Sequence, residues 1–484
     1  MNRQKSITLA ILGLIIFSGS IVSSFQPSIQ SLELKQRNSY QLLIIAPDVF
    51  SEELERLVVH KNSIGMNTVL ITLEEILESP ETNFGRDDAE KMKYYIKYAR
   101  ETFDISYVLL VGGRKGQTNS WYLPVRYVHM DNGWEHRYIS DLYFADIYDE
   151  HGLFSTWNKD ANCRFGEWTQ GEEPIDTYIN LYPDVSLGRL PCRSAKEVND
   201  VVDKIISYET NTYQQPWFDK ILAIAGDTYL ESSNPLWAGY EGEEYANIAI
   251  DYMSDYEPTR MFLSENGFTG SSEVINAINQ GYGFIYFVGH GNPRTWGTHP
   301  PNEPEFVRGL QNHEMNRLSN NAKYFVCVVS GCHNCQFDVH ILNLVKDFFE
   351  DGFSFFSIPG GKVWRYEWVP ESWGWKITRL KDKGSVVTFG TTALGHTKED
   401  KTSFMGGINE LEVELFNQIG VNNVTYAGDV LKETITWYLD TYPIDWDENN
   451  MNILNDYWID VQVVQSYVLF GDPTLKIGGY PNYV

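Results

Sequence analysis

The feature that most constrains the fold of this chain is a regular alternation of apolar, strand-like runs with amphipathic, helix-like segments. Residues 40–48 form a short apolar run typical of a buried strand, and residues 51–65 follow it with helical periodicity. The same alternation continues to residue 113 and restarts over residues 219–291. Strands that alternate with helices predict a mostly parallel sheet covered by helices on both faces, so we expect an α/β fold.

One stretch of the chain has a different character. Residues 127–184 are rich in Asp, Trp and Gly and show little periodicity, which predicts a long functional insertion at the edge of the sheet. A Gln-Gln-Pro-Trp run at residues 214–217 indicates a hinge. We therefore expect two subdomains: an N-terminal α/β subdomain over residues 40–212, which carries the acidic insertion, and a catalytic subdomain over residues 216–480.

The charge of the chain excludes one class of function. Its 484 residues include 38 Lys and Arg against 65 Asp and Glu, a formal net charge of −27. A protein that binds the phosphate backbone needs a basic face, so we expect no nucleic-acid partner. The acidic balance suits an extracellular protein, a cation binder or an enzyme that attracts basic substrates.

The N-terminus predicts export. Two basic residues precede an apolar run over residues 7–17, and small, polar residues follow with a predicted cut after Ser24. This layout is typical of a signal peptide, residues 1–24, which contacts the membrane only transiently. The alternative is an uncleaved membrane anchor, although the run is shorter than the ~20 residues that a bilayer span needs. We expect a secreted, extracellular protein.

Two predicted strands end in reactive side chains. The apolar run over residues 283–291 leads into His290, and the run over residues 323–332 leads into Cys332. Reactive residues of parallel α/β sheets sit at the carboxyl ends of adjacent strands, so we expect these two side chains to lie side by side. An imidazole beside a thiol can assist thiolate formation and then protonate a leaving amine. The backbone amides of Gly291 and Cys332 are the candidates for an oxyanion site.

Simpler interpretations of these residues remain open. A histidine after a strand is often a satisfied surface side chain, and a cysteine that ends an apolar run is often a small hydrophobic residue. Cys332 and Cys335 could instead form a redox pair or half of a zinc site, but no second C-x-x-C pair exists in the chain. The chain has five cysteines, so at least one thiol has no partner within it.

Four blocks of sequence resemble one known family. GHGNPRTWGT at residues 289–298 and VVSGCHNCQF at residues 328–337 are similar to the histidine and cysteine motifs of the gingipain-like cysteine peptidases, in the clan of caspases and legumain. Residues 184–209 and 468–478 resemble two further blocks of that family. The resemblance spans roughly residues 40–478. It implies a caspase-like, three-layer α/β/α fold with mostly parallel sheets and two subdomains.

The resemblance also implies a role for each catalytic residue. Cys332 would attack the scissile carbonyl and form an acyl-enzyme, and His290 would act as general acid and base. The amides of Gly291 and Cys332 would bind the oxyanion. The family orients its histidine with a carboxylate from the first subdomain, and Glu167 is our candidate for it.

Three further residues are predicted to contact substrate: Trp296, Asn180 and Asn334. The trypsin-like gingipains carry an acid for a basic P1 side chain shortly before a strand that resembles residues 184–191. The comparable position here is near Asn180. A neutral residue at that position leaves the P1 preference open.

The insertion contains a candidate calcium loop. Asn158, Asp160 and Asn162 place side-chain oxygens at alternate positions, and Glu167 follows them. Alternating oxygen donors suit a hard cation such as Ca²⁺, and weak calcium sites are common outside cells. The alternative is a solvated turn closed by Asx hydrogen bonds. The proposed chemistry itself requires no cofactor.

The sequence therefore predicts a secreted, gingipain-like cysteine endopeptidase that hydrolyses protein or peptide substrates. One alternative is a transpeptidase of the sortase type, which uses the same acyl-enzyme. A second alternative is a catalytically silent binding module, which the intact His290 and Cys332 argue against. The sequence leaves zymogen processing, disulfide pairing and the oligomeric state open.

Overall fold

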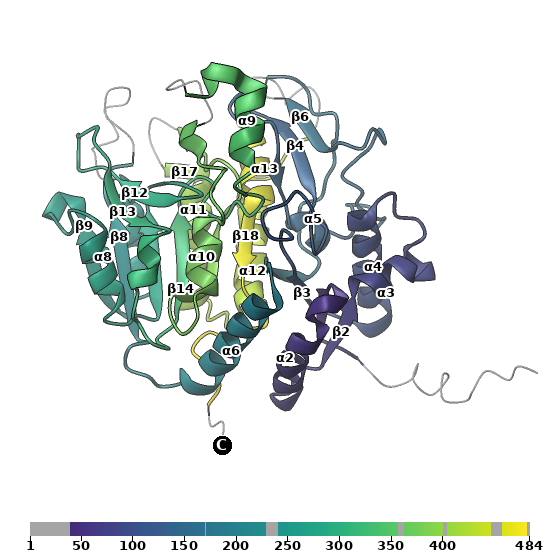
Figure 1. Ribbon diagram of the computed structural model, residues 1–484, viewed down its shortest axis with the longest axis horizontal. Helices are drawn as coiled ribbons and strands as arrows, with labels where there is room; N and C mark the ends of the chain where they lie inside the picture. The colour runs from purple at the N-terminus through teal and green to yellow at the C-terminus, as the bar shows by residue number, and fades with distance from the viewer. Residues whose placement is uncertain are drawn as a thin grey trace, which may run out of the picture. The chain divides into compact units, whose positions relative to one another are not determined.

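Ten strands form one central sheet in the computed structural model (Figure 1). In sheet order they are β2 (Thr68–Thr72), β1 (Leu42–Ala46), β3 (Tyr107–Val111), β7 (Ser186–Leu190), β18 (Tyr467–Phe470), β15 (Ser385–Thr391), β14 (Phe325–Ser330), β10 (Phe284–Val288), β8 (Lys220–Ala225) and β9 (Glu257–Phe262). All neighbouring strands are parallel except β15 and β18. The expected mostly parallel α/β sheet is confirmed.

The structure describes residues 39–169, 171–228, 241–356, 363–399, 404–446 and 457–481, which belong to one compact unit that begins at Ser39. The predicted signal peptide lies outside these residues. Within them, no helix has the length and apolar character needed to cross a membrane. One sheet contains strands from both sides of residues 212–215, so the division into two subdomains stays a prediction.

The antiparallel pair within the central sheet decides which segments can reach the predicted site. β18 runs antiparallel to β15, with Tyr467 opposite Thr391, and parallel to β7. The carboxyl ends of β10, β14 and β15 therefore lie at the same edge of the sheet as the amino end of β7. The insertion leads into β7, and it does reach this edge, because the hydroxyl of Thr392 donates to the carbonyl of Ile139 over 2.6 Å.

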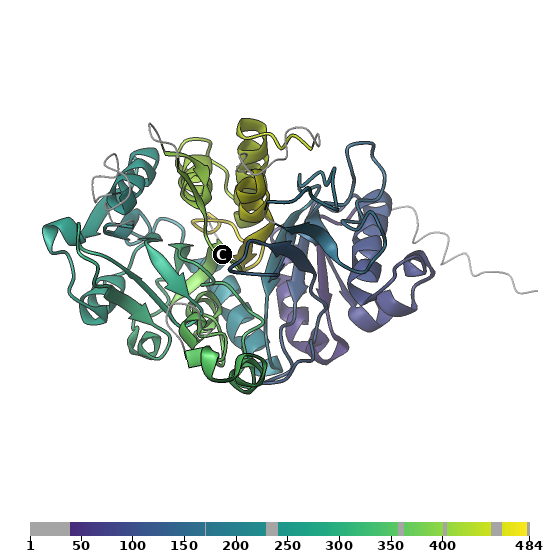
Figure 2. The same ribbon diagram turned by 90° about the horizontal axis from the view of Figure 1, so that it is seen from above.

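Helices cover both faces of the sheet (Figure 2). One layer contains α2 (Ser51–Ser63), α6 (Ala195–Asn211) and α10 (Trp373–Arg379), and the other contains α7 (Glu241–Tyr252), α11 (Ile408–Gly420) and α12 (Ala427–Thr441). The sequence explains these positions, since the strands are apolar on both faces: every residue of β1, β10 and β14 is buried. The side chain of Ser194 accepts the Glu197 amide and caps α6, as its sequence predicts.

The insertion has more regular structure than its sequence indicates. β4 (Tyr127–Asp131), β5 (Tyr138–Ile139) and β6 (Phe165–Thr169) form a small sheet in the order β5-β4-β6, and the short helix α5 spans Leu142–Ala145. A bidentate ion pair joins the insertion to the core, because Nε and Nη2 of Arg189 on β7 each donate to Asp141 over 2.7 Å. Both side chains are buried, and Arg189 is fully so.

Breaking this buried pair is expected to destabilise the fold. Asp141→Ala leaves the Arg189 guanidinium buried without a counter-charge, which costs about 3–5 kcal/mol of unfolding free energy. Thermal and urea denaturation measure the loss. The matched control is Asp203→Asn, which breaks an exposed pair with Arg56 and should change stability by less than about 1 kcal/mol. Equal effects of the two variants would contradict the prediction.

Candidate active site

The loops that carry His290 and Cys332 follow two neighbouring strands of the sheet, and both strands end at the same edge. β10 and β14 are parallel neighbours, with Val288 opposite Ser330, so the histidine and cysteine loops begin side by side. Their backbones are in close contact: a Cβ atom on Gly331 would lie 3.0 Å from both the N and Cα atoms of Gly291. The structure thus brings His290 and Cys332, the residues next to these glycines, to one edge of the sheet.

A backbone carbonyl orients the His290 imidazole. Its Nε2 atom lies 2.5 Å from the carbonyl oxygen of Thr228, three residues beyond the end of β8. A carbonyl only accepts hydrogen bonds, so Nε2 carries the proton and Nδ1 is the basic nitrogen. Burial lowers the pKa of His290, while the Thr228 hydrogen bond and the charge of Asp227 oppose that shift. The imidazole is therefore held in its neutral form, ready to accept a proton.

Two buried carboxyl groups lie close to this histidine, and the sequence interpretation missed both. Asp227 precedes Thr228, and Glu241 begins α7. Glu241 accepts the Thr228 amide over 3.5 Å, and Asp227 accepts the Asn302 amide over 2.9 Å. Burial and the neighbouring Asp227 raise the pKa of Glu241 to about 7. A signal existed in the sequence, because Asp227 follows the strand-like run that neighbours the histidine strand.

The thiol of Cys332 has a well-defined partner. The amide of Gly395 donates to its Sγ atom over 3.3 Å. Cys332 is partly exposed, whereas Cys327 and Cys335 are buried. Burial raises the pKa of Cys332, and the carboxyls of Glu135 and Glu412 raise it further, whereas the Gly395 hydrogen bond lowers it. The free protein therefore favours a neutral thiol at Cys332 and a neutral imidazole at His290.

Asn334 connects the two loops and does not face a substrate. Its Nδ2 atom donates to the carbonyls of Asn292 over 2.8 Å and Thr295 over 3.1 Å, which are the two sides of the histidine hairpin. The side chain is fully buried. This corrects the prediction that Asn334 contacts substrate: its amide group joins the histidine hairpin to the cysteine loop.

Trp296 requires a similar correction. It lies on β12 (Thr295–Thr298), which pairs with β11 (His290–Asn292), and its side chain is fully buried. Its indole N–H donates to the carbonyl of Ser330 over 3.2 Å, and its ring packs edge-on against Phe287. Trp296 therefore supports the ends of β10 and β14 from within the core and is not a substrate contact.

The structure places Glu167 and Asn180 in the insertion, and their observed partners lie there too. Glu167 is on β6, where its two carboxylate oxygens contact Arg164 and Asn162, each over 2.6 Å. Asn180 donates to the carbonyl of Tyr148 over 3.1 Å. Both oxygens of Glu167 have local partners, and Asp227 is the carboxylate whose charge acts on the pKa of His290.

The candidate calcium residues form Asx turns. Asp160 accepts the amide of Asn162 over 3.1 Å, and Asn162 accepts the amide of Arg164 over 2.7 Å. The Arg164 cation next to Glu167 disfavours a second cation there. In the part of the chain that is described, no group of three His, Cys, Asp or Glu could hold a metal. Calcium binding stays a prediction.

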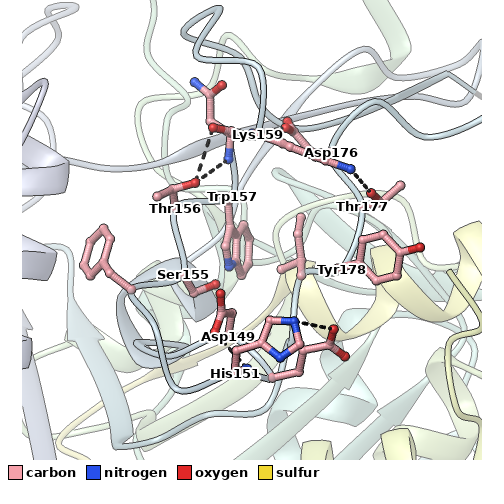
Figure 3. Close-up of a pocket in the computed structure, with 13 residues that line it drawn as sticks. Asp149, His151, Ser155, Thr156, Trp157, Lys159, Asp176, Thr177 and Tyr178 are labelled. Atoms are coloured by element: carbon pink, nitrogen blue, oxygen red, sulfur yellow. Dashed lines mark hydrogen bonds and ion pairs between the residues drawn. The ribbon is translucent and has the colours of Figure 1, made fainter.

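Asn158, the first of those residues, lies apart from the turn. It is buried and lines a hollow of about 390 Å³ within the insertion. Figure 3 shows Trp157, Asp176 and Tyr178 around this hollow. Asp176 accepts backbone amides of Lys159 and Glu167 and so closes the loop on itself. None of these hydrogen bonds involves His290 or Cys332.

The sheet defines a caspase-like α/β fold, and the loops that carry His290 and Cys332 lie at one edge of it. The chain belongs to peptidase family C25, whose sequence model matches residues 35–478. Its fold is similar to the crystal structure of the Arg-specific cysteine proteinase gingipain R, with a TM-score of 0.58 and 17% identity over 91% of this chain and 79% of that one. The expected family and fold are thereby confirmed.

Curated relatives match over shorter stretches. Gingipain R2 of Porphyromonas gingivalis is 23% identical over 268 residues, which are 55% of this chain and 29% of that protein. Lys-gingipain W83 of the same organism is 22% identical over 230 residues, which are 46% of this chain and 10% of that protein. The matched part is thus less than a third of the length of either relative.

Proposed function

We propose that this protein is a cysteine endopeptidase that acts through Cys332 and His290. The observation that carries the proposal is the paired geometry of two strand ends, which brings a partly exposed cysteine and an imidazole fixed by a backbone carbonyl to the same edge of the sheet. Membership of a peptidase family supports it. The intact pair also favours an enzyme over a silent binding module.

The proposed reaction begins with the neutral pair. His290 Nδ1 takes the thiol proton, and the Cys332 thiolate attacks the scissile carbonyl carbon. The backbone amides of Gly291 and Cys332 stabilise the oxyanion. When the intermediate collapses, the C–N bond breaks and the imidazolium gives its proton to the leaving amine. Water activated by His290 then hydrolyses the thioester, which releases the acid product and the thiol.

Two features of the site support the proton transfers. The Thr228 carbonyl keeps the imidazole in the tautomer with a basic Nδ1. The charge of Asp227 favours the imidazolium that forms during the reaction, because opposite charges at close range stabilise each other in a buried site. We therefore assign to Asp227 the role for which the sequence suggested Glu167.

The buried acids also support a preference for basic residues at P1. Asp227 and Glu241 place two carboxyl groups near His290. Gingipain R is described as Arg-specific, and another relative carries the name Lys-gingipain. We also propose export by the predicted signal peptide, with protein or peptide substrates outside the cell. N-terminal sequencing of the mature protein tests the predicted cut after Ser24.

A positional-scanning peptide library tests the function directly. We expect cleavage with enrichment of Arg or Lys at P1, and mass mapping should locate any acyl adduct on Cys332. An added amine acceptor separates the two enzymatic proposals, because a transpeptidase yields ligated product from the same acyl-enzyme. An absence of both cleavage and adduct across the library would contradict an enzymatic role.

A further inference from the structure

A turn of the insertion reaches the loop that carries the hydrogen-bond donor to Cys332. The turn follows β4, and Asn132 closes it, because its Oδ1 atom accepts the amides of Trp134 over 3.0 Å and Glu135 over 2.8 Å. This leaves the Glu135 side chain 8% exposed. The insertion therefore delivers a carboxyl group to the interior of the catalytic edge.

Glu135 binds that loop one residue away from the donor. Its Oε2 atom accepts the Leu394 amide over 3.1 Å, and Gln462 donates to the same oxygen over 3.4 Å. Gln462 also donates to the Leu394 carbonyl over 3.2 Å, so both backbone groups of Leu394 are held. The next amide along the chain, that of Gly395, donates to Cys332 Sγ. Hydrogen bonds from two successive backbone amides thus link the turn to Glu135 on one side and to the thiol on the other.

The second oxygen of Glu135 approaches the other side of the nucleophile. Oε1 lies 3.7 Å from Nδ1 of His333, the residue after Cys332. His333 is buried, has a left-handed backbone with φ of 58°, and donates its amide to the Ala393 carbonyl over 2.8 Å. A left-handed histidine next to the nucleophile needs support from its surroundings to persist. Glu135 contacts both segments that fix the position of Cys332.

We propose that Glu135 is a positioning residue for Cys332. Its carboxyl group, together with Gln462, fixes the turn at Leu394 and Gly395 and so aims the Gly395 amide at the thiol. The inference deepens the proposed peptidase function. Only its prediction for kcat rests on that function, because the reactivity of the Cys332 thiol can be measured without a substrate.

The electrostatic surroundings of Glu135 make the arrangement sensitive to charge. The groups that face it are His333, Asp338, Arg365 and Glu367, in addition to Cys332. Burial raises the pKa of Glu135 to about 8, and a pocket of about 490 Å³ opens onto it and gives a route for proton exchange. Once ionised, Glu135 disfavours the Cys332 thiolate, because like charges repel.

Iodoacetamide alkylation of the mature protein, followed by mass spectrometry across pH, tests the proposal. The exposed Cys163 serves as the reference thiol. Glu135→Gln keeps an acceptor for the Leu394 amide but removes the negative charge. The midpoint of Cys332 alkylation should therefore move to lower pH, while the midpoint of Cys163 alkylation should not change. Glu135→Ala also removes the acceptor, so kcat should fall by about 10- to 100-fold, as expected when a reacting group is misplaced. Glu150→Gln, at an exposed site of the insertion, should leave both values unchanged.

The outcomes separate the possible roles. A lower midpoint in the Gln variant and a lost kcat in the Ala variant support positioning. If the pH midpoint of Cys332 alkylation shifts but the unchanged protein cleaves no peptide, the positioning role of Glu135 is supported and the proposed peptidase function is contradicted. Equal losses of thermal stability in both variants, with no shift of the Cys332 midpoint, would make Glu135 merely structural and overturn the proposal.

Discussion

Replacing Cys332 by alanine is expected to abolish peptide cleavage while the protein stays folded. The thiol is partly exposed, so its loss removes the nucleophile and little packing. Without the thiolate no acyl-enzyme forms, and kcat should fall by a factor on the order of 10⁴–10⁶, the scale seen when a nucleophile is deleted. Turnover of the best library peptide measures the loss, and a melting temperature close to that of the unchanged protein shows that the fold persists.

A neighbouring cysteine supplies the matched control. Cys335→Ala removes a fully buried thiol that a Cβ on Gly374 would approach to 2.5 Å. We expect Cys335→Ala to lower the melting temperature, whereas the protein should still cleave peptides. In the unchanged protein, an alkylating reagent should modify Cys332 well ahead of the buried Cys327. Cleavage by the Cys332→Ala protein at an undiminished rate would falsify the assignment of the nucleophile.

The position of the site could be predicted from sequence because it depends on short-range patterns. β10 and β14 are continuous apolar runs, and such runs are typical of strands buried on both faces. Each run ends in a glycine followed by a reactive residue, and parallel strands bring their carboxyl ends to one edge. No knowledge of the intervening chain was needed to expect His290 and Cys332 near each other.

The direction of individual side chains could not be predicted in the same way. Trp296 and Asn334 stand in the matched motifs, yet both point into the core. Trp296 fits there because Gly309 on the next strand leaves room for its ring: a Cβ on that glycine would lie 2.2 Å from the indole. Such packing depends on a residue from another strand, which the motif itself does not contain.

The supporting carboxylates were missed for a different reason. Asp227 and Glu135 reach the site from distant parts of the chain. Asp227 adjoins Thr228, whose carbonyl accepts the hydrogen bond from His290, and Glu135 accepts the hydrogen bond from the Leu394 amide. Contacts to backbone groups leave no residue-type signature at the contacted position. Glu167 was suggested as the carboxylate that the family resemblance implies, but on β6 its two oxygens have local partners.

Replacing His290 by alanine is expected to lower kcat by about 10²–10⁴-fold, the usual contribution of general acid–base catalysis. The reason is specific to its position, because it is the imidazole whose Nε2 is fixed by the Thr228 carbonyl, which leaves Nδ1 as the base. KM should change far less than kcat, since the side chain acts on protons and not on the bulk of the substrate. Steady-state kinetics with the best library peptide measures both.

Two controls make the His290 result interpretable. His151→Ala removes a histidine that is 73% exposed and should leave kcat unchanged. Alkylation of Cys332 in the His290→Ala protein should still proceed at alkaline pH, because the Gly395 amide remains in place to stabilise the thiolate. If the His290→Ala protein kept most of its turnover, another group would have to supply the protons, and the nearest candidate is His299, whose ring lies 5.5 Å from that of His290. The double variant would then identify the base, since only loss of the true base removes the remaining activity.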